Sequence, residues 1–146
     1  MSGSIPELPC LCASFRRASR ALTQIYDAAV RPLGLRVTQF TILQALALTG
    51  EVPQNRLGGI LALDSTTLTR TLAIMGRRGW VAEKRGRDGR ERLLSLTKAG
   101  RGLLGRASVP WQEVQDRVRA RLGVIHWQEL FDVNRKVTML ARGGAR

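Results

Sequence analysis

The chain has few aromatic residues and few cysteines, and it has no long apolar run. Aromatic side chains make up only 5% of the 146 residues, while leucine and alanine dominate the 44% that are hydrophobic, which favours helices. No stretch approaches the roughly 18 apolar residues of a membrane helix, and the N-terminus lacks a basic start followed by an apolar run. We therefore expect a mainly α-helical, cytoplasmic protein without a membrane partner.

Motifs for metal binding, nucleotide binding and covalent catalysis are also missing. The 2 cysteines and 1 histidine lack the Cys-x-x-Cys spacing and the fourth ligand of a structural zinc site. The sequence contains no glycine-rich phosphate loop, no pair of catalytic carboxylates and no nucleophile triad. We expect no metal, no cofactor and no enzymatic activity.

Basic residues, in contrast, are in large excess. Lysine and arginine number 24 against 11 acidic residues, which gives a formal net charge of +13. Such a surface attracts polyanions, most commonly nucleic acid or anionic lipid. Most of these residues are arginine, which suits phosphate and guanine recognition, although a GC-rich coding bias enriches arginine in the same way. The charge alone does not identify the partner.

The spacing of apolar residues and the candidate caps predict six helices. Thr38, Asp64 and Thr97 are the expected N-caps of three of them, and Gly50 and Gly79 lie where two of them should end. The expected helices are Leu8 to Arg31, Thr38 to Leu48, a short one within 52–63, Ser65 to Arg78, Thr97 to Leu122, and His126 to Arg142.

The helix from Ser65 has two distinct faces. At about 100° per residue, Leu68, Leu72 and Met75 fall on one side, and this side should pack in a core. The opposite side should be free for a partner and carries Ser65, Thr66, Thr69, Arg70, Ala73 and Arg77.

A basic hairpin directly follows that helix. In WVAEKRGRDGRERLLSL, two short strands are joined at Asp88-Gly89, which is a strong hairpin signal. The tip carries four arginines: Arg85, Arg87, Arg90 and Arg92. Three short helices followed by a basic hairpin predict a winged helix-turn-helix, which places one helix in the major groove of double-stranded DNA and the wing near the minor groove. For any single hydroxyl residue, a solvated helix face is the alternative.

The sequence resembles the MarR family of bacterial transcriptional regulators. The resemblance rests on GLRVTQFTILQAL, on LDSTTLTRTLAIMGRRGWVAEKR, and above all on RDGRERLLSLTKAGR, which matches the family's Asp-x-Arg wing followed by Leu-Thr-x-x-Gly. It implies a homodimer, with residues 1–34 and 99–146 as dimerisation helices and residues 35–98 as the DNA-binding domain. It also implies that Arg90 enters the minor groove and that Asp88 orients a wing arginine. The DNA-binding residues we expect are Ser65, Thr66, Thr67, Thr69, Arg70, Arg77, Arg85, Arg87, Asp88 and Arg90.

Within this family, the N-terminal region is most similar to the OhrR-type branch, which senses organic hydroperoxides. Cys12 matches the position of that branch's reactive cysteine, and Tyr26 matches a tyrosine that hydrogen-bonds it. Arg16 and Val37 depart from the pattern because the branch often has further tyrosines there, and no distant cysteine can act as a resolving partner. Independently of the resemblance, a cysteine in the first turns of a helix, one turn before Arg16, is favoured as the thiolate that peroxide oxidises.

The second cysteine, Cys10, lies roughly 200° around a helix from Cys12, so a disulfide between them requires the helix start to unwind. Packing as small apolar residues is the alternative role for both. Our hypothesis is a repressor that binds a pseudopalindrome and is released when Cys12 is oxidised, or when a small-molecule ligand binds beside the dimer interface. A thiol-dependent peroxidase and a DNA-packaging protein are the alternatives from other functional classes.

Overall fold

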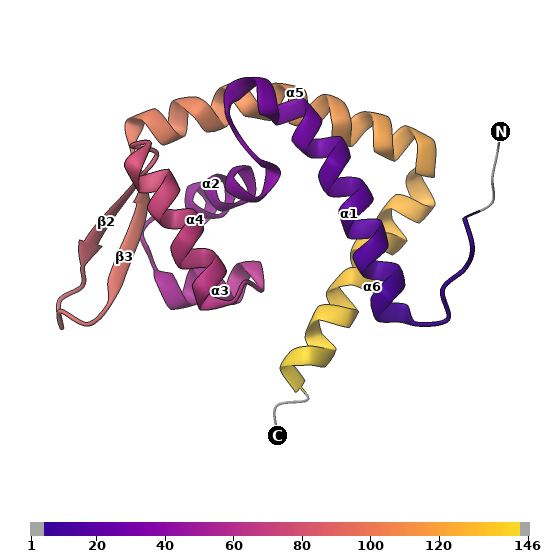
Figure 1. Cartoon of the computed structure of the whole chain (residues 1–146), viewed down its shortest axis with the longest axis horizontal. Coiled ribbons are helices and arrows are strands. Elements are labelled where there is room, and N and C mark those ends of the chain that lie inside the picture. Colours follow the sequence, from indigo (N-terminus) through magenta and orange to yellow (C-terminus); the bar gives the residue numbers. More distant parts are fainter. Residues whose placement is uncertain (1–4, 144–146) are drawn as a thin grey trace. The chain divides into compact units, whose positions relative to one another are not determined.

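The structure is a computed structural model that describes residues 5–143. It divides into two compact units, one ending at Trp111 and the other beginning at Gln112. Helices dominate, as predicted, and none of those within residues 5–143 is long and apolar enough to cross a membrane. The longer elements are labelled in Figure 1: α1 (Leu11–Val30), α2 (Val37–Thr49), α3 (Gln54–Leu61), α4 (Ser65–Arg77), β2 (Val81–Arg85), β3 (Arg92–Leu96), α5 (Lys98–Leu122) and α6 (Val124–Gly143). Two short elements complete the order: the 3-10 helix η1 (Arg31–Leu33) after α1, and strand β1 (Val52–Pro53) after α2.

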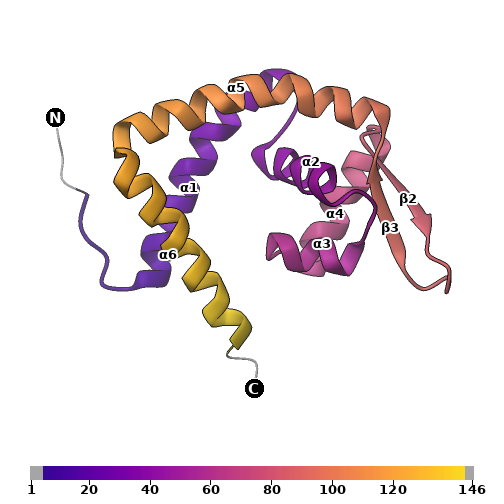
Figure 2. The same ribbon diagram turned by 180° about the vertical axis from the view of Figure 1, so that it is seen from behind.

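The first unit has the predicted winged helix-turn-helix, with one additional strand. β2 and β3 pair antiparallel along their whole length and form the wing, which extends away from α2, α3 and α4 in Figures 1 and 2. In β1, Val52 pairs with Leu94 and Pro53 pairs with Leu93, so the sheet order is β1-β3-β2. Proline has no backbone N–H to donate to a neighbouring strand, but β1 is an edge strand, where such a residue is tolerated. A strand of two residues is too short to show alternation in the sequence, so we did not predict it.

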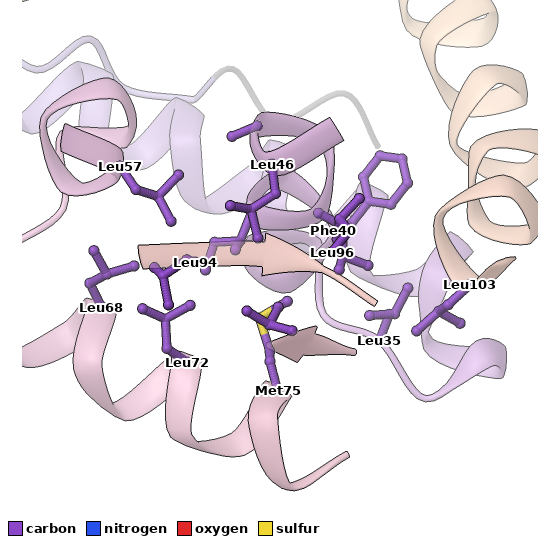
Figure 3. Packing of buried hydrophobic residues seen from close by; sticks show 14 of the residues in the cluster. Leu35, Phe40, Leu46, Leu57, Leu68, Leu72, Met75, Leu94, Leu96 and Leu103 are labelled. Atoms are coloured by element: carbon purple, nitrogen blue, oxygen red, sulfur yellow. The ribbon is translucent and has the colours of Figure 1, made fainter. Parts of the chain in front are cut away.

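One apolar core holds this unit together (Figure 3). The side chains of Leu68, Leu72 and Met75 are buried on the inner side of α4, as its helical spacing predicted. Burying a side chain of this size stabilises the fold by roughly 1.5–3 kcal/mol. The other large core residues come mainly from α2, α3, β3 and the first part of α5: Phe40, Ile42, Leu43, Leu46, Leu57, Leu94, Leu96 and Leu103. Because α4 packs through one side only, its polar side remains on the surface.

The start of α2 differs from the prediction. The helix begins at Val37, and Arg36 occupies the N-cap position, so the prediction that Thr38 caps this helix is wrong. The side-chain oxygen of Gln39 accepts from the Arg36 backbone N–H at 3.0 Å, and Asp27 Oδ1 accepts from the Val37 N–H at 2.6 Å. The second acceptor comes from α1, so a reading of the local sequence could not find it.

The other two predicted caps are confirmed. Asp64 accepts a hydrogen bond of 2.8 Å from the backbone N–H of Thr67 at the start of α4. Thr97 Oγ1 accepts one of 3.0 Å from the N–H of Gly100 in the first turn of α5. Gly79 follows the end of α4 with φ of +72°, a conformation that suits glycine.

Candidate nucleic-acid interface

The outer side of α4 is exposed along its whole length, as predicted. The exposed residues are Ser65, Thr66, Thr69, Arg70, Ala73 and Arg77. Thr67 has a different role, because its hydroxyl donates to Asp64 Oδ2 at 2.6 Å as part of the N-cap. The hydrogen bonds from the Thr67 hydroxyl and backbone hold the pKa of Asp64 below its usual value. Thr67 thus stabilises the start of the helix, and its contact with DNA stays a prediction.

Gln54 is a residue of this surface that we did not predict. It is the first residue of α3, and its side-chain Nε2 donates to Thr69 Oγ1 at 2.9 Å. The two residues are 15 positions apart, and no local pattern links them. The available signal was a polar residue directly after Pro53, at the start of the helix that precedes α4.

At the tip of the wing, Asp88 organises the backbone of the turn. Its Oδ1 accepts from the N–H of Arg90 at 3.1 Å and from the N–H of Glu91 at 3.3 Å. The salt bridges within residues 5–143 include one of 3.4 Å between Arg92 and Glu83 but none with Asp88. Asp88 therefore shapes the turn that carries Arg90, and its contact with an arginine side chain stays a prediction.

Within the described range, one wing arginine is held in a salt bridge, and the other three are not. Arg92 pairs with Glu83, whereas Arg85, Arg87 and Arg90 are exposed and have no ion pair in the part of the chain that the structure describes. At the base of the wing, Lys84 Nζ lies 2.7 Å from Glu51 Oε2 and connects β2 to the residue before β1. Three guanidinium groups are thus free to bind phosphate or a base edge.

The helix-turn-helix and the wing together line one open groove of about 870 Å³. α3 contributes Gln54, α4 contributes Ser65 and Thr69, and the wing contributes Arg90. Hydroxyl, amide and guanidinium groups therefore face the same space, and these are the groups that bind phosphates and base edges in DNA.

The cysteines lie outside this groove, at the start of α1. Cys10 is the N-cap residue, Cys12 is in the first turn, and both side chains are exposed in the single chain. Tyr26 is half-buried, and burial raises its pKa. Tyr26 and Cys12 are both in α1, separated by about 21 Å along its axis at ~1.5 Å per residue. A hydrogen bond between them is therefore impossible within one chain.

Comparison with known proteins agrees with this architecture, although no protein-family model matches the chain. The transcriptional regulator MosR of M. tuberculosis, solved in complex with DNA, is 35% identical with a TM-score of 0.85, over 94% of this chain and 99% of MosR. YwoH of Bacillus subtilis (strain 168), an HTH-type transcriptional regulator, is 30% identical over 88 residues, which are 60% of this chain and 64% of YwoH. The match therefore spans less than two thirds of YwoH.

The E. coli protein MarR shares the fold. A MarR variant complexed with operator DNA is 20% identical, with a TM-score of 0.79, over 87% of this chain and 92% of that chain. The identity to MosR over nearly the whole length of both chains establishes the relationship that the wing motif indicated. The chain belongs to the MarR family of transcriptional regulators.

Proposed function

We propose that this regulator binds a pseudopalindromic operator in double-stranded DNA as a homodimer and represses transcription. The observation that carries the proposal is the shared groove, in which Ser65 and Thr69 of α4 lie beside Arg90 of the wing. α4 enters the major groove, Arg70 reaches a base or phosphate, and the wing arginines enter the narrower minor groove. The net charge of +13 supplies the long-range attraction to DNA.

Binding to operator and scrambled duplexes at several salt concentrations tests this function. A reader of bases should bind the operator about a thousandfold or more tightly than the scrambled duplex. Equal affinity for both duplexes at every salt concentration would instead indicate a DNA-packaging protein. The peroxidase alternative is set aside because the related regulators are not enzymes.

The dimer is formed by residues 1–34 and 99–146, and the DNA-binding domain by residues 35–98. This proposal is supported by the apolar side chains that a single chain leaves exposed on its terminal helices. They are Leu11, Leu22 and Ile25 on α1, and Ile125, Leu130, Phe131, Val133, Met139 and Leu140 on α6. A two-fold dimer is the most common way to bury such surfaces.

The effector is an organic peroxide that oxidises Cys12. Cys12 is exposed in the first turn of α1, one turn before Arg16, so a peroxide can reach its sulfur. The Cys12 thiolate attacks the terminal oxygen of the hydroperoxide, the O–O bond breaks, and Cys12 becomes a sulfenic acid. The alkoxide that leaves takes a proton from water and becomes an alcohol. The added polar bulk shifts the packed helices of the dimer as rigid bodies, so the distance between the two recognition helices changes and the operator is released.

Tyr26 supports Cys12 from the second subunit, because it cannot reach Cys12 within its own chain. In this arrangement the two α1 helices cross antiparallel, and the two-fold axis passes close to Ser19, which lies midway between Cys12 and Tyr26. Cys12 of one subunit then faces Tyr26 of the other. The side chain of Ser19 is small and exposed, which permits close approach of the two helices at this point.

Cross-linking tests this arrangement of the dimer. In a protein with Cys10→Ser and Cys12→Ser, the further change Ser19→Cys should give a covalent dimer under mild oxidation, because the new thiols meet at the two-fold axis. Gln24→Cys in the same background is the control, since its thiols lie further from the axis and should remain monomeric on a non-reducing gel. Equal cross-linking of the two variants, or none with Ser19→Cys, contradicts the antiparallel crossing.

A further inference from the structure

Thr69 differs from four other helix threonines of this protein in the hydrogen bond that its hydroxyl makes. Four threonine hydroxyls donate to the backbone carbonyl four residues earlier, each at 2.9 Å: Thr41, Thr49, Thr71 and Thr138. Thr69 instead accepts from Gln54 Nε2, and the hydrogen bonds within residues 5–143 include none that its hydroxyl donates. A hydroxyl has one donor proton and two acceptor lone pairs. The proton of Thr69 is therefore available to a partner outside the chain.

The backbone next to Gln54 fixes where its side chain begins. Pro53 precedes it, and Pro53 pairs with Leu93 of β3 in the sheet. The proline ring restricts φ, and the antiparallel pairing sets the direction in which α3 begins. Gln54 is also half-buried, whereas Thr69 is exposed. The sheet thus fixes the position from which the Gln54 side chain reaches the Thr69 hydroxyl.

We infer that Gln54 is a specificity-determining residue, because it donates to the Thr69 hydroxyl and so leaves the hydroxyl proton free to donate to the DNA. This inference rests on the proposed binding of α4 in the major groove. There, purine N7, guanine O6 and thymine O4 are acceptors, whereas the amino groups of adenine and cytosine are donors. At one position of each half-site, the protein should prefer a base that presents an acceptor to Thr69.

The variant Gln54→Glu tests the direction of this hydrogen bond. A carboxylate has nearly the shape of the amide but only accepts, so Thr69 must donate to it and present a lone pair to the groove. The preference at that position should shift toward a base with an amino group, by about 3- to 10-fold, the range for one hydrogen bond. The measurement is competition among operator duplexes that carry each of the four base pairs at each half-site position.

Two further variants separate this effect from added charge and from lost contact. Asn55→Asp introduces the same charge at the next residue of the groove and keeps the oxygen that accepts from the Arg56 N–H at 2.7 Å. It should weaken binding to all duplexes similarly and leave the base preference unchanged.

Thr69→Val keeps the shape of the side chain but removes the hydroxyl. It should therefore reduce discrimination among base pairs at the same position, whether residue 54 is glutamine or glutamate. Thermal unfolding of each variant verifies that it is folded.

The outcomes distinguish this inference from the proposed function. If the unaltered protein does not prefer its operator, the proposed function is wrong. If it does, but Gln54→Glu keeps the original base preference or loses affinity equally for all base pairs as Asn55→Asp does, the inference is wrong. Gln54 would then only join α3 to α4.

Discussion

The carboxylate of Asp27 accepts a hydrogen bond of 2.6 Å from the backbone N–H of Val37. Asp27 lies in the last turn of α1 and Val37 is the first residue of α2, so one helix satisfies an N–H that the next helix leaves without an internal partner. Only 8% of Asp27 is exposed, and Arg36 Nη1 lies 3.7 Å from its second oxygen. This side chain therefore joins α1, which we assign to the dimer, to the first helix of the DNA-binding domain.

The variant Asp27→Ala should lower the free energy of unfolding by about 1.5–3 kcal/mol, the range for a hydrogen bond to a charged group. Asp27→Asn should lose less stability, because its amide oxygen can still accept the hydrogen bond from the Val37 N–H. Asp132→Ala is the control, since Asp132 forms an exposed pair with Arg135 at 2.6 Å and such pairs contribute at most about 1 kcal/mol. Urea unfolding followed by circular dichroism measures all three, and equal losses for both alanine variants would contradict the role of Asp27.

Asp64 should make the stability of the protein depend on pH. Its pKa is lowered in the folded state by the hydroxyl and backbone hydrogen bonds of Thr67, so its contribution is present above the unfolded pKa of about 3.9 and is lost as the pH falls through the folded pKa. The difference in unfolding free energy between the unaltered protein and Asp64→Ala should therefore be constant from about pH 7 to 5 and shrink below about pH 4. A difference that stays constant down to the lowest measurable pH would show that the carboxylate does not stabilise the cap.

Gly100 should be required where the wing joins α5. A Cβ atom at this position would lie far inside van der Waals contact with the carbonyl oxygen of Trp80. Gly100→Ala should therefore cost about 1–3 kcal/mol or more of stability, as overpacking does, and weaken operator binding because the base of the wing shifts. Gly105→Ala in the same helix has no atom within 4 Å of its Cβ and should be neutral or stabilising by up to ~1 kcal/mol. Thermal unfolding compares them.

Arg90 should contribute more to operator affinity than Arg92, although both are in the wing. Arg90 has no ion pair among the described residues, whereas Arg92 is paired with Glu83 at 3.4 Å. Arg90→Ala should cost about 1–3 kcal/mol of binding and, if it contacts a phosphate, reduce the salt dependence by about one counterion. Arg92→Ala should cost less. Gel-shift titrations at two salt concentrations measure the operator affinity of both variants. A larger loss of affinity for Arg92→Ala than for Arg90→Ala would refute the assignment of the wing contacts.

Cys12→Ser should bind the operator normally and remain bound when an organic peroxide is added, because serine cannot form a sulfenic acid. Cys10→Ser should keep most of the response. If the unaltered protein stays on its operator under peroxide, or if Cys12→Ser is also released, then oxidation of Cys12 is not the signal. A reversible small-molecule ligand would then be the better explanation. Fluorescence anisotropy of labelled operator follows the release in real time.

The predictions that held concern local features of the chain. Helical spacing separated Leu68, Leu72 and Met75 from the exposed polar side of α4, and the cap at Asp64 and the turn at Asp88-Gly89 were recognisable from a few neighbouring residues. These features depend on interactions within one helix or one hairpin. The sequence therefore determined the winged helix-turn-helix and most of its candidate DNA-binding surface.

Contacts between distant parts of the chain were decided only by the tertiary structure. Asp27 replaces Thr38 as a cap for α2, β1 pairs with β3, and Gln54 holds the hydroxyl of Thr69. Each of these contacts joins separate elements whose approach depends on how the core packs, and a hydrogen bond or strand pairing leaves no periodic trace in the residues between its partners. For the same reason, the exposure of the polar α4 side chains followed from the sequence, whereas the hydrogen bond that Thr69 accepts from Gln54 required the fold.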